Sequence, residues 1–433
     1  MVPLDKSTRR DFVKKSGSAV LGSTLGFNIL QAADFKKGIN SETLKVGVIG
    51  CGGRGTGAAL QATRSEDNVV LTCMADVFED RLKQSHSNLM QENPDKIKVD
   101  EGNMFVGFDG YKKVLESDVD VVLLSTPPCF RPGHLKAAIE ADKHVFCEKP
   151  VAVDAPGIRS VIDSAKVAKE KDLALMSGFC WRHDDPKQET YSRLLDGAIG
   201  DIHTVYNTYN TGALWFKETK PEWSAFQKNL RNWIYFTWMS GDHITEQAVH
   251  SLDLMAWAMG DQLPVTATGT GGRQSRTDDK FGNVYDHFAI VFDYADGQKG
   301  FHFSRQQKGC SRAYGLDILG SKGKCNIHVS NNHHIVGKKE WKWKGERNDM
   351  YQTEHDTLFA SIRAGKPFND GIKMAHSTML AIWGRMAAYT GQTISWEEAL
   401  NSNDSLGPKL DAYDWDLDWA ARDVAKPGIT KFA

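Results

Sequence analysis

The sequence lacks paired cysteines, a long hydrophobic run and an excess of charge of either sign. Its seven cysteines form no Cys-x-x-Cys pair and leave an odd count, so neither a zinc knuckle nor a complete disulfide set is expected. No uninterrupted apolar run is long enough to predict a membrane-spanning helix in the mature chain. The 53 Lys and Arg residues nearly balance 55 Asp and Glu residues, which argues against nucleic-acid binding. We therefore expect a globular protein without a metal site.

The chain has 433 residues, which is too long for one small hydrophobic core and predicts two domains. No internal repeat or low-complexity tract suggests a solenoid or a long disordered region. The two parts must therefore be recognised by a change in the pattern of strands and helices.

The first 33 residues have the features of an export signal. Residues 8–14 read TRRDFVK, a weakly hydrophobic run rich in Gly and Ser follows, and Gln31-Ala32-Ala33 comes next. This pattern resembles a twin-arginine signal, which directs folded proteins across a bacterial inner membrane. It predicts that the twin-arginine export machinery delivers the folded chain to the periplasm. Residues 34–43 are expected to form a polar linker.

Residues 44–180 alternate short apolar strands with helices. The expected strands lie in LKVGVIG, NVVLTCMAD, VDVVLLSTPP, HVFCEKP and LALMSGF. Continuous apolar strands separated by helices predict a parallel sheet covered on both faces. We therefore expect an α/β fold that begins with a doubly wound Rossmann domain.

The pattern changes after residue 180. The expected strands lie in HTVYNTYN, PVTATGTGG, YDHFAIVFDY, QKGFHFSRQ, AYGLDILG and CNIHVS, and Asp296-Gly297 predicts one hairpin turn. Two helices should follow and end at Gly365 and Gly391. Residues 181–433 are thus predicted to form a C-terminal α+β domain with a large, mostly antiparallel open sheet and a helical tail.

A dinucleotide motif lies at the first strand-to-helix turn. Gly50-x-Gly52-x-x-Gly55 follows VGVI, and these glycines let the backbone and the helix N-terminus approach a pyrophosphate. Asp76 ends the second strand, where its carboxylate can accept hydrogen bonds from the ribose hydroxyls of adenosine and would repel a 2′-phosphate. The predicted cofactor is therefore NAD, although nearby Arg81 leaves NADP as an alternative.

Three further segments indicate a family. They are STPP at 125–128, HVFCEKP at 144–150 and GDHITEQAVHSLD at 241–253. Together with the glycine motif they resemble the Gfo/Idh/MocA superfamily of oxidoreductases over about residues 44–400. The resemblance implies a cofactor site that includes Gly53, Arg54, Thr126, Pro127, Glu148, Lys149 and Arg182, and it implies an oligomer of identical subunits. A salt-bridged surface role for Arg182 stays open.

Lys149 follows a strand at its carboxyl end, where open parallel sheets bind their ligands. Its ammonium group is predicted to lie beside the nicotinamide and to hydrogen-bond the hydroxyl that is oxidised. The alternative is a surface lysine before a proline.

His250 is the predicted acid/base residue, because an imidazole titrates near neutral pH. It follows Glu246 by four positions, so one helix from about His243 to Met259, capped by Asp242 and ended by Gly260, would place both side chains on one face. The family has Asp where this chain has Glu246, which puts an Asp-like role in doubt. A satisfied core histidine is the alternative for His250.

The remaining candidates are predicted to contact substrate. His243 begins the same helix, and Arg231 and Trp233 lie in an aromatic region that also contains Trp215, Trp223, Tyr235 and Trp238. Aromatic faces beside charged groups suit a carbohydrate, whereas core packing or an oligomer interface would also explain them. His134 is expected to be structural.

An exported enzyme cannot exchange NAD with the cytoplasmic pool, so its cofactor must be recycled in place. The leading interpretation is an NAD-dependent oxidoreductase that acts at a secondary alcohol of a sugar or glycoside and keeps its cofactor. Redox-neutral hydrolysis, elimination or epimerisation through a 3-keto intermediate is an alternative. A sugar-binding protein without turnover is a second one.

Overall fold

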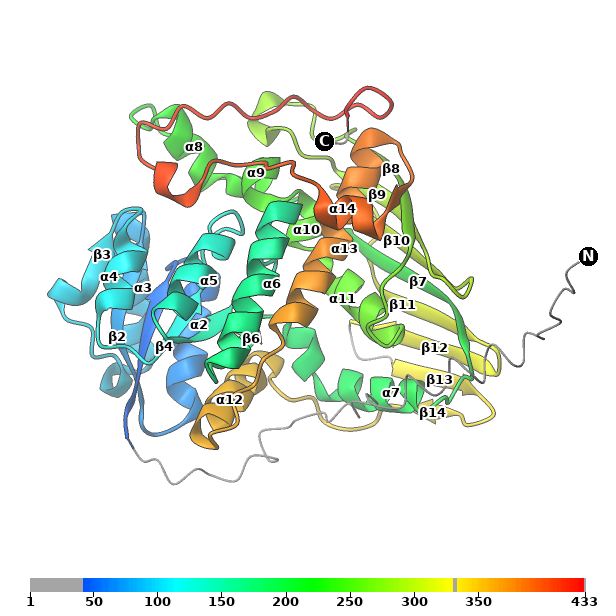
Figure 1. The fold of residues 1–433 in the computed structure, drawn as a ribbon, viewed down its shortest axis with the longest axis horizontal. Coiled ribbons are helices and arrows are strands. Elements are labelled where there is room, and N and C mark those ends of the chain that lie inside the picture. Colours follow the sequence, from blue (N-terminus) through cyan, green and yellow to red (C-terminus); the bar gives the residue numbers. More distant parts are fainter. Residues whose placement is uncertain (1–41, 330–332, 432–433) are drawn as a thin grey trace, which may run out of the picture.

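The computed structural model describes residues 42–329 and 333–431 (Figure 1). The predicted twin-arginine signal, residues 1–33, lies outside the described residues, as does nearly all of the predicted linker. Within the described part, no helix is both long and apolar enough to cross a membrane.

The first domain contains a six-stranded parallel sheet in the order β3-β2-β1-β4-β5-β6. Its strands are β1 (Leu44–Ile49), β2 (Val69–Asp76), β3 (Met104–Val106), β4 (Val121–Leu124), β5 (His144–Cys147) and β6 (Leu175–Ser177). Alternate residues of each strand are buried on opposite faces: Val122 and Leu124 join one core cluster, while Val121 and Leu123 join another. This burial on both faces explains the continuous apolar strands and confirms the predicted Rossmann fold.

Helices cover both faces of this sheet. They are α2 (Gly53–Ser65), α3 (Glu79–Glu92), α4 (Gly110–Glu116), α5 (Arg131–Glu140) and α6 (Ala155–Glu170). Leucines of α3 and alanines of α2 pack on one face, whereas apolar residues of α4, α5 and α6 pack on the other. The carboxyl ends of the strands are left facing the second domain.

The second domain contains a nine-stranded sheet in the order β14-β13-β12-β11-β7-β10-β9-β8-β15. Only β7 and β10 pair in parallel, so the predicted mostly antiparallel sheet is confirmed. The strands are β7 (Ile202–Thr211), β8 (Thr266–Gly272), β9 (His287–Asp293), β10 (Lys299–Gln306), β11 (Ala313–Gly320), β12 (Gly323–His328), β13 (His333–Gly337), β14 (Trp341–Lys342) and β15 (Ile394–Ser395). Asp296-Gly297 forms the β9–β10 turn, where Gly297 has a φ of 82°.

The helices that follow the large sheet return to the first domain. In α12 (Met350–Arg363), Leu358 and Phe359 pack with residues of α2, and α13 (Gly371–Thr390) packs between α6 and β8. Gly365 and Gly391 have φ values of 61° and 70° directly after these helices, as the sequence predicted. The predicted helical tail of the second domain thus closes one face of the first.

The helix predicted from His243 to Met259 is wrong as a single element. It divides into α10 (His243–Glu246) and α11 (Val249–Ala258), because the backbone bends at Gln247, whose φ and ψ are −116° and −49°. Asp242 caps α10 and Gly260 follows α11 with a φ of 67°, so both predicted ends are correct. The bend removes the regular four-residue relation between Glu246 and His250.

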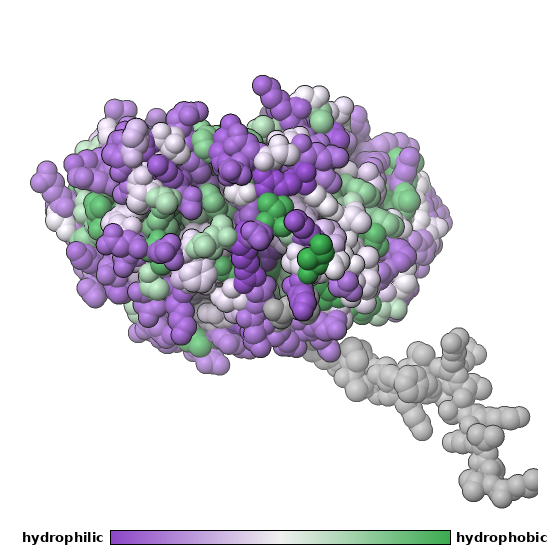
Figure 2. Space-filling model, turned by 90° about the horizontal axis from the view of Figure 1, so that it is seen from above, coloured by the Kyte–Doolittle hydropathy of each residue, from purple (hydrophilic) through white to green (hydrophobic). Residues whose placement is uncertain are grey.

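Of the remaining α-helices, α8 (Ala225–Arg231) and α9 (Thr237–Ser240) lie in the upper part of Figure 1, whereas α7 (Asp185–Leu195) lies at the bottom, against β13. The short helix α14 (Trp396–Asn401) packs on α6 and α13. The C-terminal segment after α14, red in Figure 1, runs across the top of the first domain beside α8 and α9. Seen from above, this face is mainly hydrophilic with small, separate apolar patches (Figure 2).

Candidate active site

The turn between β1 and α2 has the space and the polarity that a pyrophosphate requires. A Cβ at Gly50, whose φ is 98°, would lie 2.6 Å from the Thr126 nitrogen, and one at Gly55 would lie 1.8 Å from the Gly50 oxygen. Gly52 and Gly53 face open space, and no side chain caps the first turn of α2. The free N–H groups of this turn therefore fit an anionic ligand.

Asp76 lies at the end of β2, beside this turn. Its two carboxylate oxygens accept backbone N–H groups of Cys51 at 2.7 Å and Phe78 at 2.8 Å, which fix its orientation. Burial raises the pKa of Asp76, while these two donors oppose the shift. Further lone pairs of the carboxylate remain for ribose hydroxyls.

A cavity of about 990 Å³ runs along the turn and Asp76. This volume is at the upper end of the range typical of ligand sites. Its lining includes the predicted cofactor residues Gly50, Gly52, Gly53, Arg54, Asp76, Thr126 and Pro127. His134 also lines it; its Nδ1 lies 3.2 Å from the Thr126 hydroxyl, and burial lowers the pKa of this histidine to about 3.

Lys149 comes two residues after β5 and meets the end of α10. Its Nζ donates a hydrogen bond of 2.7 Å to the backbone carbonyl of Glu246. An ammonium group has three N–H donors, so two remain for other ligands. Within the described residues the Glu246 carboxylate makes no hydrogen bond, so the structure joins these two predicted residues through the backbone of Glu246.

His250 is the second residue of α11 and is stacked on an aromatic ring. Its imidazole lies 4.9 Å from the Trp181 ring centroid, and Phe179 meets it edge-on at 6.1 Å. Burial lowers the pKa of His250 well below its usual range, and the positive charges of Lys149 and Lys187 lower it further. The imidazole is therefore neutral at pH 7, and its Nδ1 has no hydrogen-bond partner among the described residues.

A buried charge network that the sequence did not reveal lies next to Lys149. Arg54 forms ion pairs with Glu148 and, at 3.4 Å, with Glu354 of α12, and its guanidinium lies 4.7 Å above the Tyr351 ring. Burial raises the pKa of Glu354 well above its usual range. Glu354 is separated from Arg54 by 300 positions and belongs to none of the recognised motifs, so no local pattern predicted the contact.

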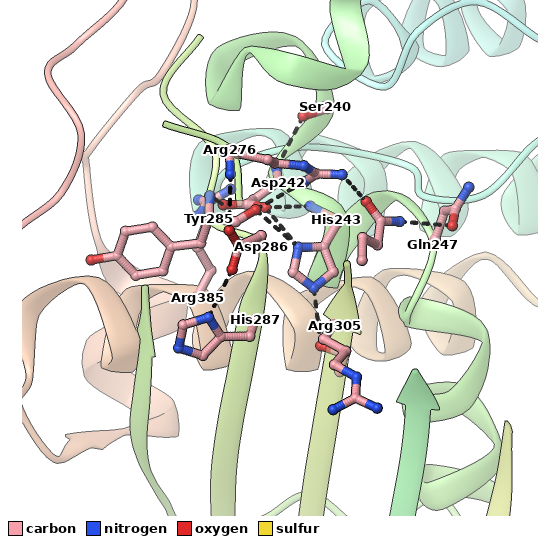
Figure 3. Close-up of polar contacts among 12 residues, drawn as sticks. Ser240, Asp242, His243, Gln247, Arg276, Tyr285, Asp286, His287, Arg305 and Arg385 are labelled. Atoms are coloured by element: carbon pink, nitrogen blue, oxygen red, sulfur yellow. Dashed lines mark hydrogen bonds and ion pairs between the residues drawn. The ribbon is translucent and has the colours of Figure 1, made fainter. Parts of the chain in front are cut away.

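His243, a predicted substrate residue, is turned away from the cavity. It is 2% exposed, and its ring lies between Asp242, 3.2 Å from Nδ1, and Ser304, 3.3 Å from Nε2. Figure 3 shows this imidazole in a polar network with Asp242, near the ends of strands of the large sheet. Asp242 also accepts the Tyr285 N–H at 2.7 Å, which holds the start of α10 against β9 and β10. The structure therefore gives His243 a supporting position.

Arg182, a predicted cofactor residue, is bound to other side chains of the protein. Its guanidinium donates to Asp253 and Asp261 at 2.8 Å each and lies 5.2 Å above the Trp257 ring. Arg182 does not line the large cavity, and neither do Gly55, Glu148, Lys149, Glu246 and His250. The ion pairs of Arg182 agree with the salt-bridged alternative, although its side chain is only 11% exposed and therefore is not at the surface.

The predicted substrate aromatics divide between the cavity and a core cluster. Trp215, Trp223 and Trp233 line the cavity, whereas Trp238 is 3% exposed and packs with Phe226 and Tyr413. Arg231 also lines the cavity, but its guanidinium is paired with Asp80. These residues therefore lie near the end of the cavity marked by Asp76.

The comparisons agree with this two-domain arrangement. Residues 44–179 match the model of an oxidoreductase family with an NAD-binding Rossmann fold, and residues 188–326 match the C-terminal domain of the GFO/IDH/MocA family. Myo-inositol 2-dehydrogenase of Thermotoga maritima is 23% identical over 75% of this chain and 90% of its own length. The 2,7-anhydro-N-acetylneuraminate hydratase of Escherichia coli is 24% identical over 57% of this chain and 65% of its own length.

Among solved structures, the aldose-aldose oxidoreductase of Caulobacter crescentus has a TM-score of 0.65 at 18% identity, covering 82% of this chain and all of that one. This likeness supports the fold. The two family matches together cover most of the described chain, including the glycine turn, Lys149 and His250. The chain belongs to the Gfo/Idh/MocA family of NAD(P)-dependent oxidoreductases.

Proposed function

We propose that this protein uses NAD to oxidise a secondary alcohol of a sugar or glycoside and keeps the cofactor through successive turnovers. The observation that carries the proposal is that Lys149 lies near His250, whose pKa it helps to lower, and that Glu148, the neighbour of Lys149, pairs with Arg54 of the dinucleotide turn. Asp76 favours NAD over NADP, because its carboxylate would repel the 2′-phosphate of NADP.

Lys149 and His250 have different roles in the proposed reaction. The two free N–H donors of Lys149 hold the substrate hydroxyl oxygen, and His250 accepts the hydroxyl proton. A neutral imidazole is required for this step, and the burial and nearby cations that lower the pKa of His250 supply it. Bound NAD would supply the acceptor for the hydrogen and electron pair that leave the carbinol carbon.

A carbohydrate substrate is supported by the relatives. Trp215 and Trp233, which were predicted to contact the sugar, line the cavity together with Asp76, at the end that would hold the adenosine half, so they do not support this part of the proposal. Myo-inositol 2-dehydrogenase and the aldose-aldose oxidoreductase carry polyol and sugar substrates in their names. We propose the same chemical class for this chain.

A retained cofactor follows if the twin-arginine pattern directs the folded protein to the periplasm. NAD would then be bound before export, and each reduction must be followed by reoxidation at the same site. A second sugar carbonyl that takes back the hydrogen and electron pair would close the cycle. The open face of the large sheet is the surface that we propose for a homo-oligomer.

A redox-neutral reaction is the second candidate, and the similarity to a hydratase favours it. Oxidation at C3 of a sugar acidifies the neighbouring C2–H, which permits elimination of the C1 substituent. Addition of water and return of the hydrogen and electron pair to C3 would give hydrolysis without net redox change. Sugar binding without turnover is less consistent with the site, because Lys149 and His250 are both present.

The proposal is tested with purified, desalted protein and a panel of free sugars and glycosides. Nicotinamide released on denaturation, together with a rise of the reduced-nicotinamide absorbance band with one sugar, is the expected result. Product analysis without an added acceptor then separates net oxidation from a redox-neutral reaction. If no sugar changes the band even with NAD or NADP added, the proposed oxidation is wrong.

A further inference from the structure

One end of the dinucleotide cavity is built from both domains. Asp76, Asp80 and Arg81 line it from the first domain. Segment 212–235, which connects β7 to α9, lines the same cavity from the second domain, through Trp215, Lys217, Trp223, Leu230, Arg231 and Trp233. Because Asp76 is the predicted ribose contact, segment 212–235 faces the adenosine half of a bound dinucleotide.

A two-pronged ion pair joins segment 212–235 to the first domain. Arg231, the last residue of α8, donates from Nη1 and Nη2 to the two carboxylate oxygens of Asp80 at 2.9 and 2.8 Å. Asp80 lies in the first turn of α3, four residues beyond Asp76. The two side chains therefore connect the domains at the rim of the cavity.

Aromatic rings enclose the guanidinium of this pair. It lies 3.9 Å from the Phe78 ring centroid and 4.7 Å from that of Trp223, so one ring comes from each domain. The Arg231 side chain is 16% exposed, whereas Asp80 is 64% exposed. Cation–π contacts of a shielded guanidinium add to the ion pair, which alone would be weak near water.

The C-terminal segment that follows α14 packs against the same end of the cavity. The Trp415 ring lies 5.4 Å from Phe78 and 4.8 Å from Phe108, and Phe226 of α8 stacks on Phe108 at 5.9 Å. Three parts of the chain thus meet around the same end of the cavity. A cavity nevertheless remains among these three parts of the chain.

We propose that segment 212–235 is a clasp that retains the dinucleotide, with the Arg231–Asp80 pair as its latch. The cofactor leaves only after this pair separates and the clasp moves off the adenosine half. The inference rests on the proposed function, because retention matters when one bound NAD serves many turnovers. Neither latch residue contacts Lys149 or His250, so the effect that distinguishes the latch is the rate of cofactor release.

The test compares NAD release from the wild type, Arg231→Ala and Asp80→Asn. Arg193→Ala is the matched control, because Arg193 also pairs with a carboxylate, Glu189, and lies 4.9 Å above a tryptophan ring, Trp341, but outside the cavity. Each protein is loaded with NADH, mixed with excess NAD, and followed by the loss of bound NADH fluorescence. Thermal melting of each apoprotein checks folding.

We expect release to be about 10- to 100-fold faster in both latch variants and unchanged in Arg193→Ala. The exchanged pair Arg231→Asp with Asp80→Arg should recover part of the retention. Wild-type release rates in Arg231→Ala would overturn the clasp.

The clasp and the proposed function fail separately. If the wild type releases NADH as fast as the latch variants but oxidises sugars with added NAD, the clasp is wrong and the proposed function stands. If the latch variants release NADH faster but no sugar is oxidised, the clasp stands as a cofactor-binding device and the proposed function is wrong.

Discussion

The two ends of the cofactor site are stabilised in different ways. At the Asp76 end, aromatic rings from both domains pack together and one partly exposed ion pair joins them. At the Lys149 end, ionic groups are concentrated: Arg54 pairs with Glu148 and Glu354, and the positive charges of Lys149, Lys187 and Arg54 act on His250. Aromatic packing therefore stabilises mainly the Asp76 end of the site, whereas interactions between charged groups dominate at the Lys149 end.

This contrast matches the different tasks of a bound dinucleotide. Its adenosine half must be held, and aromatic contacts with oriented carboxylates achieve this without chemical reactivity. Its nicotinamide half must react, and reaction needs groups whose pKa values are shifted by burial and neighbouring charges. Substitutions at the two ends should accordingly separate binding from catalysis.

The largest effect is expected from Lys149→Met. Removing the ammonium removes the donor to the substrate oxygen, and the turnover number should fall about 10³-fold or more. NAD content after desalting should stay at the wild-type level, because the glycine turn and Asp76 are untouched. Near-normal turnover would show that Lys149 does not take part in the chemistry.

His250→Gln should lower turnover by about 10²- to 10⁴-fold. Its pH profile sharpens the comparison further. Because the pKa of His250 is lowered, the base stays unprotonated as the pH falls below the ordinary histidine range of about 6.5, so wild-type activity should persist there and fall only at more acidic pH. An acid limb centred near an ordinary histidine pKa would contradict this environment, and His287→Gln, on an exposed ring, is the control.

Asp76→Ala should act at the other end. Loss of the carboxylate removes the proposed ribose contact and its repulsion of a 2′-phosphate, so the preference for NAD over NADP should fall about 10- to 100-fold. Turnover at saturating NAD should change little. The preference is measured as the ratio of kcat/KM for the two cofactors, and Asp118→Asn, in an exposed ion pair with Lys45, should leave it unchanged.

The smallest effect is expected from Glu246→Gln. Lys149 is held by the backbone carbonyl of Glu246, and the carboxylate makes no hydrogen bond within the described residues. Turnover should stay within about 3-fold of the wild type, while the KM for sugar rises by less than about 10-fold if the carboxylate meets a sugar hydroxyl. A loss of turnover as large as that expected for His250→Gln would show that the Glu246 carboxylate takes part directly in catalysis.

Local patterns allowed much of the site to be predicted. Gly50 and Gly55 could be recognised because a tight turn and close backbone packing require glycine at those positions. Lys149 and His250 could be placed from motifs because each lies next to a strand or helix end. In contrast, the regular helical spacing predicted one continuous helix and gave no sign of the bend at Gln247.

The sequence by itself determined the dinucleotide turn, the family and most of the order of strands and helices, because these depend on short-range periodicity and on residue types at fixed spacing. It did not predict the short strands β3, β13, β14 and β15 or the helices α4 and α7. Only the tertiary structure decided which distant charges meet. Arg231 meets Asp80, and Arg54 meets Glu354, across 151 and 300 positions. A charged residue at the surface of a helix has many possible partners, and packing of the two domains selects one of them.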